Sequence, residues 1–192
     1  MDHLCRIYKD VLSPEVCKGM IEKFENHPEQ YEQCHEGAMH FSQIKLQRHQ
    51  EWGEEVKVVL ESFLKHLKEY KKTCLNGPWQ FPENYTFEEV RMKRYLPDKV
   101  DEFGDHVDVT NYENARRYLA FFLYLDHNID GQTLFRIKGY HWSSPCIQGN
   151  LLIFPPFWPW VHAGRKPTKD PKYIIGSYLH YCLLYTSDAA DE

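Results

Sequence analysis

The sequence has no long hydrophobic segment. Its longest apolar run, LAFFLYL at 119–125, is far shorter than the roughly 20 residues that a membrane-spanning helix needs. The first ten residues, MDHLCRIYKD, carry frequent charges and lack the apolar core of a secretory signal. These absences argue against a membrane protein and against secretion. We therefore expect a cytoplasmic protein with reduced cysteines.

The chain also lacks an excess of positive charge. It has 23 Lys and Arg against 28 Asp and Glu, which gives a formal net charge of −5. Proteins that bind nucleic acids or anionic membranes through bulk charge are basic, so neither partner is expected. The six cysteines include no CxxC pair, which argues against a zinc knot. A hydrophobic content of 42% with 15% aromatic residues is typical of a globular domain.

Helical patterns dominate residues 1–80. Ser13 followed by Pro14 is typical of a helix start, with the serine as N-cap and the proline at the first helical position. Apolar residues then recur on one helical face, at Val16, Cys17, Met20, Ile21 and Phe24. A second helix is predicted from about residue 50 to 72. Its apolar stripe comprises Val56, Val59, Leu60, Phe63, Leu64 and Leu67.

Strand patterns dominate residues 81–181. The predicted strands are 85–87, 90–95, 118–125, 133–135, 150–154 and 173–181, with turns at 96–98 and 128–131. The run 118–125 is apolar almost throughout, which is typical of a strand buried on both faces. The sequence therefore predicts one α+β domain over 1–181, an antiparallel barrel or sandwich with N-terminal helices packed on one sheet.

One candidate metal site emerges from the eleven histidines. In an extended strand, residues i and i+2 share a face, so His106 and Asp108 of the HVD motif are predicted to bind one metal together. His162, after the buried strand at 150–154, is a third candidate ligand from a distant part of the chain. Two histidines and one carboxylate suit non-haem Fe(II) and leave coordination positions open for a co-substrate and dioxygen.

Lys172 is a candidate anion-binding residue, ten positions after His162. Alternation along the last strand places Lys172, Ile174, Gly176 and Tyr178 on one face. A lysine directed into a barrel is costly unless it meets an anion, and a dicarboxylate co-substrate would supply one. The alternative is a surface lysine in a lysine-rich loop that also contains Arg165, Lys166 and Lys169.

Several ordered motifs together resemble the Fe(II)- and 2-oxoglutarate-dependent oxygenases, specifically the prolyl 4-hydroxylase-like branch. The resembling segments are LSPEVC at 12–17, VRMKRY at 90–95, HVD at 106–108, GQTLF at 131–135, GNLLIF at 149–154 and HAG at 162–164. Asp130 stands where the family usually has the first glycine of its GGETLF segment. Lys172 falls where the family has its basic 2-oxoglutarate-binding residue.

The resemblance implies a double-stranded β-helix, also called a jelly roll and related to cupins. It implies Fe(II) bound by His106, Asp108 and His162, and 2-oxoglutarate bound to the iron and to Lys172. It further implies a hydrogen bond from Tyr95 to 2-oxoglutarate, and ascorbate as a reductant for the iron. Thr133 and Tyr124 are weaker candidates for this pocket, and Arg165 is a rival anchor. The implied reaction is C–H hydroxylation, including that of peptidyl proline, with release of succinate and carbon dioxide.

Two other functions remain open at this point. One is a non-catalytic binding module on the same fold, although all three metal ligands and the basic anchor are in place. The other is a cupin-like metal-dependent enzyme that does not use 2-oxoglutarate. The substrate, whether protein, peptide or small molecule, and the oligomeric state are not predicted. Loop 97–105 and the aromatic segment 157–160 are candidates for the substrate entrance.

Residues 182–192, CLLYTSDAADE, do not fit the pattern that precedes them. Reverse translation shows that a transposon-end adapter used in DNA library preparation can encode them. We interpret this segment either as a sequencing-adapter artefact or as a natural disordered tail. Without it the acidic count falls by Asp188, Asp191 and Glu192, so the net charge becomes 23 − 25 = −2.

Overall fold

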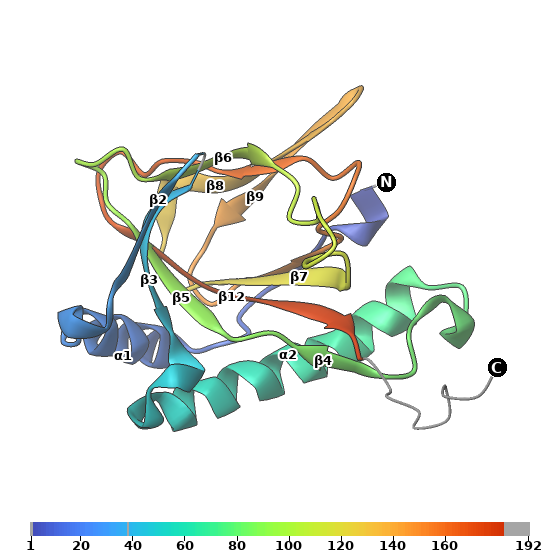
Figure 1. Ribbon diagram of the computed structural model, residues 1–192, viewed down its shortest axis with the longest axis horizontal. Helices are drawn as coiled ribbons and strands as arrows, with labels where there is room; N and C mark the ends of the chain where they lie inside the picture. Colours follow the sequence, from blue (N-terminus) through green and yellow to red (C-terminus); the bar gives the residue numbers. More distant parts are fainter. Residues whose placement is uncertain (1, 38, 183–192) are drawn as a thin grey trace.

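A computed structural model describes residues 2–37 and 39–182 (Figure 1). The two α-helices are α1 (Pro14–Glu25) and α2 (Gly53–Cys74). The strands are β1 (Arg6–Tyr8), β2 (Glu32–Glu36), β3 (Met39–Lys45), β4 (Tyr85–Phe87), β5 (Arg91–Tyr95), β6 (Glu102–His106), β7 (Arg117–Tyr124), β8 (Asn128–Ile137), β9 (Tyr140–Cys146), β10 (Leu151–Phe154), β11 (His162–Gly164) and β12 (Lys172–Tyr181). Short 3-10 helices span Asp2–Leu4, Pro28–Gln30, Leu46–Arg48, Gln50–Trp52 and Pro78–Gln80.

All strands belong to one antiparallel sheet that folds over on itself. Its order is β1-β10-β7-β12-β5-β3-β6-β11-β8-β9, with β2 also paired to β3 and β4 to β12. Strand β3 joins the two layers, because residues 39–40 pair with β6 whereas residues 42–45 pair with β5 (Figure 1). The result is a jelly roll, which confirms the predicted double-stranded β-helix and α+β class.

The helix-covered layer is buried on both faces. Along β7, Leu119, Phe121 and Leu123 pack toward the helices, whereas Ala120, Phe122 and Tyr124 point into the barrel. Strands β10 and β12 alternate in the same way. Successive side chains of a strand point to opposite faces, so an unbroken apolar run supplies two cores at once. This explains why the run at 118–125 has no polar face.

The two helices lie on the same side of the sheet (Figure 1). The Ser13 hydroxyl accepts a hydrogen bond from the Val16 amide at 3.4 Å, and Pro14 opens α1, as the sequence predicts. Helix α2 begins three residues after the predicted start and follows a 3-10 turn. The buried residues of the two helices are Cys17, Met20, Phe24, Val59, Phe63, Leu67 and Tyr70.

Three features of the fold differ from the sequence prediction. The segment 1–80 carries both helices, but it also contributes β1, β2 and the layer-joining β3. Residues 128–131 are not a turn, because they begin β8, whose pairing with β9 shifts register between Asn128 and Thr133. Strands β6, β9 and β11 were also not predicted. The final strand ends at Tyr181 as expected, and residues 183–192 of the suspected tail lie outside the described residues.

Within the part of the chain that the structure describes, no helix combines the length and the apolar character needed to cross a membrane.

The packing of α2 predicts a sharp contrast between adjacent residues. Phe63 is fully buried against the sheet, whereas Leu64 is 42% exposed. Phe63→Ala should lower the free energy of unfolding by about 3–5 kcal/mol because it leaves a cavity. The control Leu64→Ala should change it by no more than about 0.5 kcal/mol. Urea denaturation measures both, and similar losses in the two variants would contradict this packing.

Candidate metal centre

Two histidines face each other across neighbouring strands. His106 is the last residue of β6 and His162 the first of β11, and the antiparallel register pairs them directly. Their ring centroids lie 4.3 Å apart. The pairing of β6 with β11 therefore brings together two imidazoles that are far apart in the sequence.

Asp108 completes the group from outside the strand. Strand β6 ends at His106, so the expectation that all of HVD is one extended strand is wrong. The Asp108 amide instead donates a hydrogen bond to the Pro156 carbonyl at 2.7 Å, which fixes the chain as it leaves β6. The Asp108 carboxylate oxygens lie 3.3 Å from His106 Nε2 and 3.2 Å from His162 Nε2. One ligand atom from each residue falls within 4.8 Å of the others.

Backbone carbonyls hold both imidazoles in the orientation that a metal requires. His106 Nδ1 lies 2.7 Å from the Gly104 carbonyl, and His162 Nδ1 lies 3.0 Å from the Trp160 carbonyl. A carbonyl only accepts, so each Nδ1 must carry a proton, and in the neutral imidazole each Nε2 then presents a lone pair. Such a second hydrogen bond is the usual support of a metal-binding histidine.

The donor atoms of the group lack partners within the described chain. His106 Nε2, His162 Nε2 and Asp108 Oδ2 are buried and accept or donate no hydrogen bond there. Three electron-rich atoms this close repel one another unless a cation lies between them. Without a metal, burial alone would raise the pKa of Asp108, and it is the charge and hydrogen bonds of protonated His162 and His106 that lower it below its usual range. These residues therefore fit a divalent metal, and two nitrogens with one carboxylate suit Fe(II).

Two residues that the sequence analysis gave no role support Asp108. The Tyr178 hydroxyl donates to Asp108 Oδ1 at 2.7 Å, and Arg117 donates to the Asp108 carbonyl at 3.1 Å. Arg117 also lies over the Tyr178 ring at 4.1 Å and forms two hydrogen bonds with Glu88. Burial, together with the Asp108 charge, raises the pKa of Tyr178 well above its usual value, so the phenol keeps its proton. The sequence signal that could have identified Tyr178 is its position on the same face of the last strand as Lys172.

Lys172 lies inside the barrel, as its predicted strand face requires. The residue is 1% exposed, and its ammonium donates to the Arg165 carbonyl at 2.8 Å. Among the described residues it forms no ion pair with a carboxylate. Burial lowers the pKa of Lys172 to about 8. The rival anchor Arg165 is exposed, so Lys172 is the better placed cation for an anion in the interior.

Of the other residues predicted for this pocket, Tyr95 contacts Lys172, whereas Tyr124 and Thr133 bond to each other. Tyr95 is the register partner of Lys172 on β5, and the Lys172 ammonium lies 4.3 Å from the centre of the Tyr95 ring. The Tyr124 hydroxyl donates to Thr133 Oγ1 at 2.8 Å, and both residues are buried. Gly131 is required here, because a Cβ at this position would lie 2.6 Å from Lys172 Cδ.

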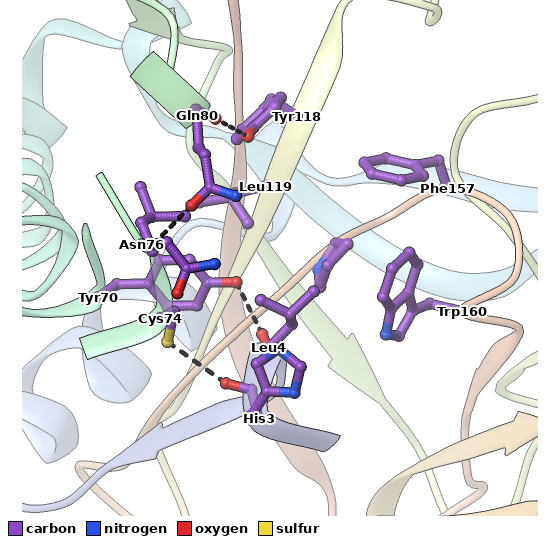
Figure 2. Close-up of a pocket in the computed structure, with 12 residues that line it drawn as sticks. His3, Leu4, Tyr70, Cys74, Asn76, Gln80, Tyr118, Leu119, Phe157 and Trp160 are labelled. Atoms are coloured by element: carbon purple, nitrogen blue, oxygen red, sulfur yellow. Dashed lines mark hydrogen bonds between the residues drawn. The ribbon is translucent and has the colours of Figure 1, made fainter. Parts of the chain in front are cut away.

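The segments predicted to flank a substrate entrance line two cavities. Phe157 and Trp160 form one side of a cavity of about 250 Å³, opposite Tyr70 and Asn76 (Figure 2). Part of loop 97–105 lines a second cavity, of about 570 Å³, beside Arg94. Neither cavity is lined by His106, Asp108 or His162. The role of both segments at an entrance therefore stays a prediction.

The jelly roll with this arrangement of strands and helices is the fold of solved prolyl hydroxylases. A viral collagen prolyl hydroxylase from Paramecium bursaria Chlorella virus-1, in complex with 2-oxoglutarate, matches with a TM-score of 0.71 and 15% identity over 93% of this chain and 97% of that one. A Pseudomonas putida prolyl-4-hydroxylase gives 0.66 and 14% identity over 94% of each chain.

A third similar structure contains a peptide. It is a prolyl hydroxylase from Trichoplax adhaerens in complex with a fragment of the hypoxia inducible factor oxygen degradation domain, with a TM-score of 0.73 and 14% identity over 93% of this chain and 84% of that one. At these identities the likeness shows the fold. No protein-family model and no curated protein sequence matches the chain.

The hydrogen bond from Tyr178 to Asp108 predicts a selective effect on metal binding. Tyr178→Phe removes the bond and frees the carboxylate to rotate, so Mn(II) affinity should fall by about tenfold. Tyr173→Phe is the matched control, because Tyr173 lies on the same strand but its hydroxyl contacts Glu25 on the helix side. Mn(II) titration followed by electron paramagnetic resonance compares them. Equal affinity in wild type and Tyr178→Phe would contradict the orienting role.

Proposed function

We propose that this protein is an Fe(II)- and 2-oxoglutarate-dependent dioxygenase that hydroxylates a C–H bond, with peptidyl proline as the first substrate class to test. The observation that carries the proposal is the presence, in one barrel interior, of a metal-binding face with unpartnered donor atoms and a buried lysine without an acidic partner. The fold of three prolyl hydroxylase structures supports it.

Each polar residue of the interior has a definite task in this proposal. His106, Asp108 and His162 hold the metal on one side only, which leaves its other side open to ligands. Lys172 binds the distal carboxylate of 2-oxoglutarate by charge and hydrogen bonding, with Tyr95, Tyr124 and Thr133 beside it. When bound, Fe(II) and 2-oxoglutarate together supply dioxygen activation, with succinate and carbon dioxide as products and a hydroxyl group transferred to the substrate.

The protein contributes orientation and exclusion of water. Tyr178 holds the Asp108 carboxylate, and the two backbone carbonyls hold the imidazoles. Aromatic side chains, among them Phe122, Phe135 and Phe154, contact the His162 ring and close the interior around it. Asp108 would occupy the coordination position that a halide takes in a halogenase, which favours hydroxylation over halogenation. Ascorbate as a reductant remains part of the proposal.

Loss of single ligands should separate metal binding from co-substrate binding. With Fe(II) and 2-oxoglutarate under anaerobic conditions, wild type should show a weak visible charge-transfer band. His106→Ala and Asp108→Ala should abolish the band, because each removes a ligand. Lys172→Met should keep Fe(II) binding and weaken 2-oxoglutarate binding by at least about tenfold, since a charge-assisted contact is lost. His141→Ala, at an exposed hairpin position, is the control.

These variants also distinguish the other functions left open by the sequence. A cupin-like enzyme would bind metal without any 2-oxoglutarate-dependent band. A non-catalytic module would form no succinate with any peptide. The proposed function instead predicts that the wild type converts 2-oxoglutarate to succinate in the presence of proline-containing peptides. Unchanged 2-oxoglutarate affinity in Lys172→Met would overturn the role of this residue.

The lowered pKa of Lys172 predicts a pH dependence. Its ammonium binds a carboxylate only when protonated, and the pKa without ligand is about 8. The affinity for 2-oxoglutarate should therefore be full below pH 8 and should fall by about tenfold per pH unit above it. In Lys172→Arg the guanidinium stays charged, so this decline should disappear. Calorimetric titration with Mn(II)-loaded protein between pH 6.5 and 9.5 measures the profile, and a flat wild-type profile would contradict it.

A further inference from the structure

A second buried lysine faces the same interior. Lys93 lies on β5 between Met92, which packs toward the helices, and Arg94, which binds Glu25 outside the barrel. Alternation along the strand therefore directs Lys93 inward, on the same face as Tyr95. Its register partner on β12 is Ile174, one of the interior core residues.

The Lys93 ammonium lies beside the candidate metal centre. It is 4.5 Å from the ring centre of Phe41 and 5.4 Å from that of Phe103. The Phe103 ring in turn stacks on the His106 ring, with centroids 3.6 Å apart and planes 6° from parallel. The ammonium and the His106 imidazole therefore both lie near the same aromatic ring.

The Lys93 ammonium has no carboxylate partner in the described parts of the chain. The residue is 7% exposed. The ring faces of Phe41 and Phe103 attract the charge but accept no conventional hydrogen bond. Burial lowers the pKa of Lys93 to about 8, while the Asp108 charge opposes this, so the charged form prevails at neutral pH.

Other cations near this end of the barrel are paired. Lys45 contacts Glu32 at 2.8 Å, Arg117 contacts Glu88 at 2.8 Å, and Arg91 shares Glu88 at 3.5 Å. Asp108 Oδ1 already accepts the Tyr178 hydrogen bond, and its carboxylate faces the two candidate metal-binding histidines. An interior-facing ammonium without a carboxylate partner leaves its positive charge available to an anion from outside.

We propose that Lys93 binds a carboxylate of the substrate and makes the protein selective for substrates with an acidic group near the carbon that is hydroxylated. This rests on the proposed function, in which the metal and Lys172 already account for both carboxylates of 2-oxoglutarate. Lys172 pairs in register with Tyr95, two residues farther along β5 than Lys93. The two lysines therefore lie at different positions along the barrel. In this proposal Lys172 binds 2-oxoglutarate and Lys93 binds the substrate.

The test uses protein loaded with Mn(II) and 2-oxoglutarate without dioxygen, so that binding is measured without turnover. The probes are matched pairs of proline-containing tripeptides that differ in one acidic group: Asp against Asn, Glu against Gln, and a free against an amidated C-terminus. Calorimetry should show the acidic member of at least one pair binding about tenfold more tightly in wild type. Lys93→Met should abolish that preference, and Lys93→Arg should keep it.

Two controls separate this inference from the others. Lys138→Met, at an exposed position between β8 and β9, should bind every probe as wild type does. Lys93→Met should bind 2-oxoglutarate as wild type does and should unfold at the same temperature or higher, because it removes only a buried charge. Loss of 2-oxoglutarate affinity in Lys93→Met would instead assign the lysine to the co-substrate and overturn the proposal.

The remaining outcomes are equally decisive. An acid preference that survives in Lys93→Met, or the absence of any acid preference in wild type that binds 2-oxoglutarate, would overturn the role of Lys93 and leave the proposed function intact. Failure of metal-loaded wild type to bind 2-oxoglutarate would overturn the proposed function itself, and the first titration shows this before any peptide is added.

Discussion

The arrangement of the interior depends on one buried carboxylate. Asp108 lies against two imidazoles at 3.2–3.3 Å, and a neutral imidazole whose Nδ1 proton is donated to a backbone carbonyl has no proton on Nε2 to give to the carboxylate. A negative charge placed there requires a positive one, and the protein supplies the geometry for a metal rather than a lysine or an arginine. Tyr178, Arg117 and the Pro156 carbonyl are then explained as the groups that keep this carboxylate in place.

The fold can stay stable with such a polar interior because much of its apolar core lies between the sheet and the helices. The strands of the helix-covered layer send one set of side chains to α1 and α2 and the other set into the barrel. The first set forms a conventional core of Leu, Ile and Phe residues. The second can therefore include Lys93 and Lys172 while the protein still gains stability from burial of apolar surface. Chemistry and stability are divided between the two faces of the same strands.

The sequence predicted the elements whose patterns are local. The Ser13 cap, the stripe of α2 and the run at 118–125 each have a period that a single segment reveals. Strand β3 was missed because its sequence, MHFSQIK, mixes polar and apolar residues without a regular alternation, and two of its three partners, β5 and β6, are distant in sequence. Motif and resemblance singled out the candidate metal ligands, which the fold brings together, whereas the position of Asp108 depends on a contact with Pro156 that no local pattern shows. Tyr178 and Lys93 lie within strands that were predicted, but the groups that they contact come from distant segments.

The position of β12 has a consequence for how the protein folds. This strand comes last among the described strands, yet it lies in the middle of the helix-covered layer, between β7 and β5. While the chain is being synthesised, one edge of β7 and one edge of β5 stay unpaired until residues 172–181 emerge. Unpaired strand edges can pair with other chains and so promote aggregation. Sheet closure also brings Lys172 and Tyr178 to the interior in the same event. The inward position of Lys172 and the hydrogen bond from Tyr178 to Asp108 therefore depend on β12 joining the sheet.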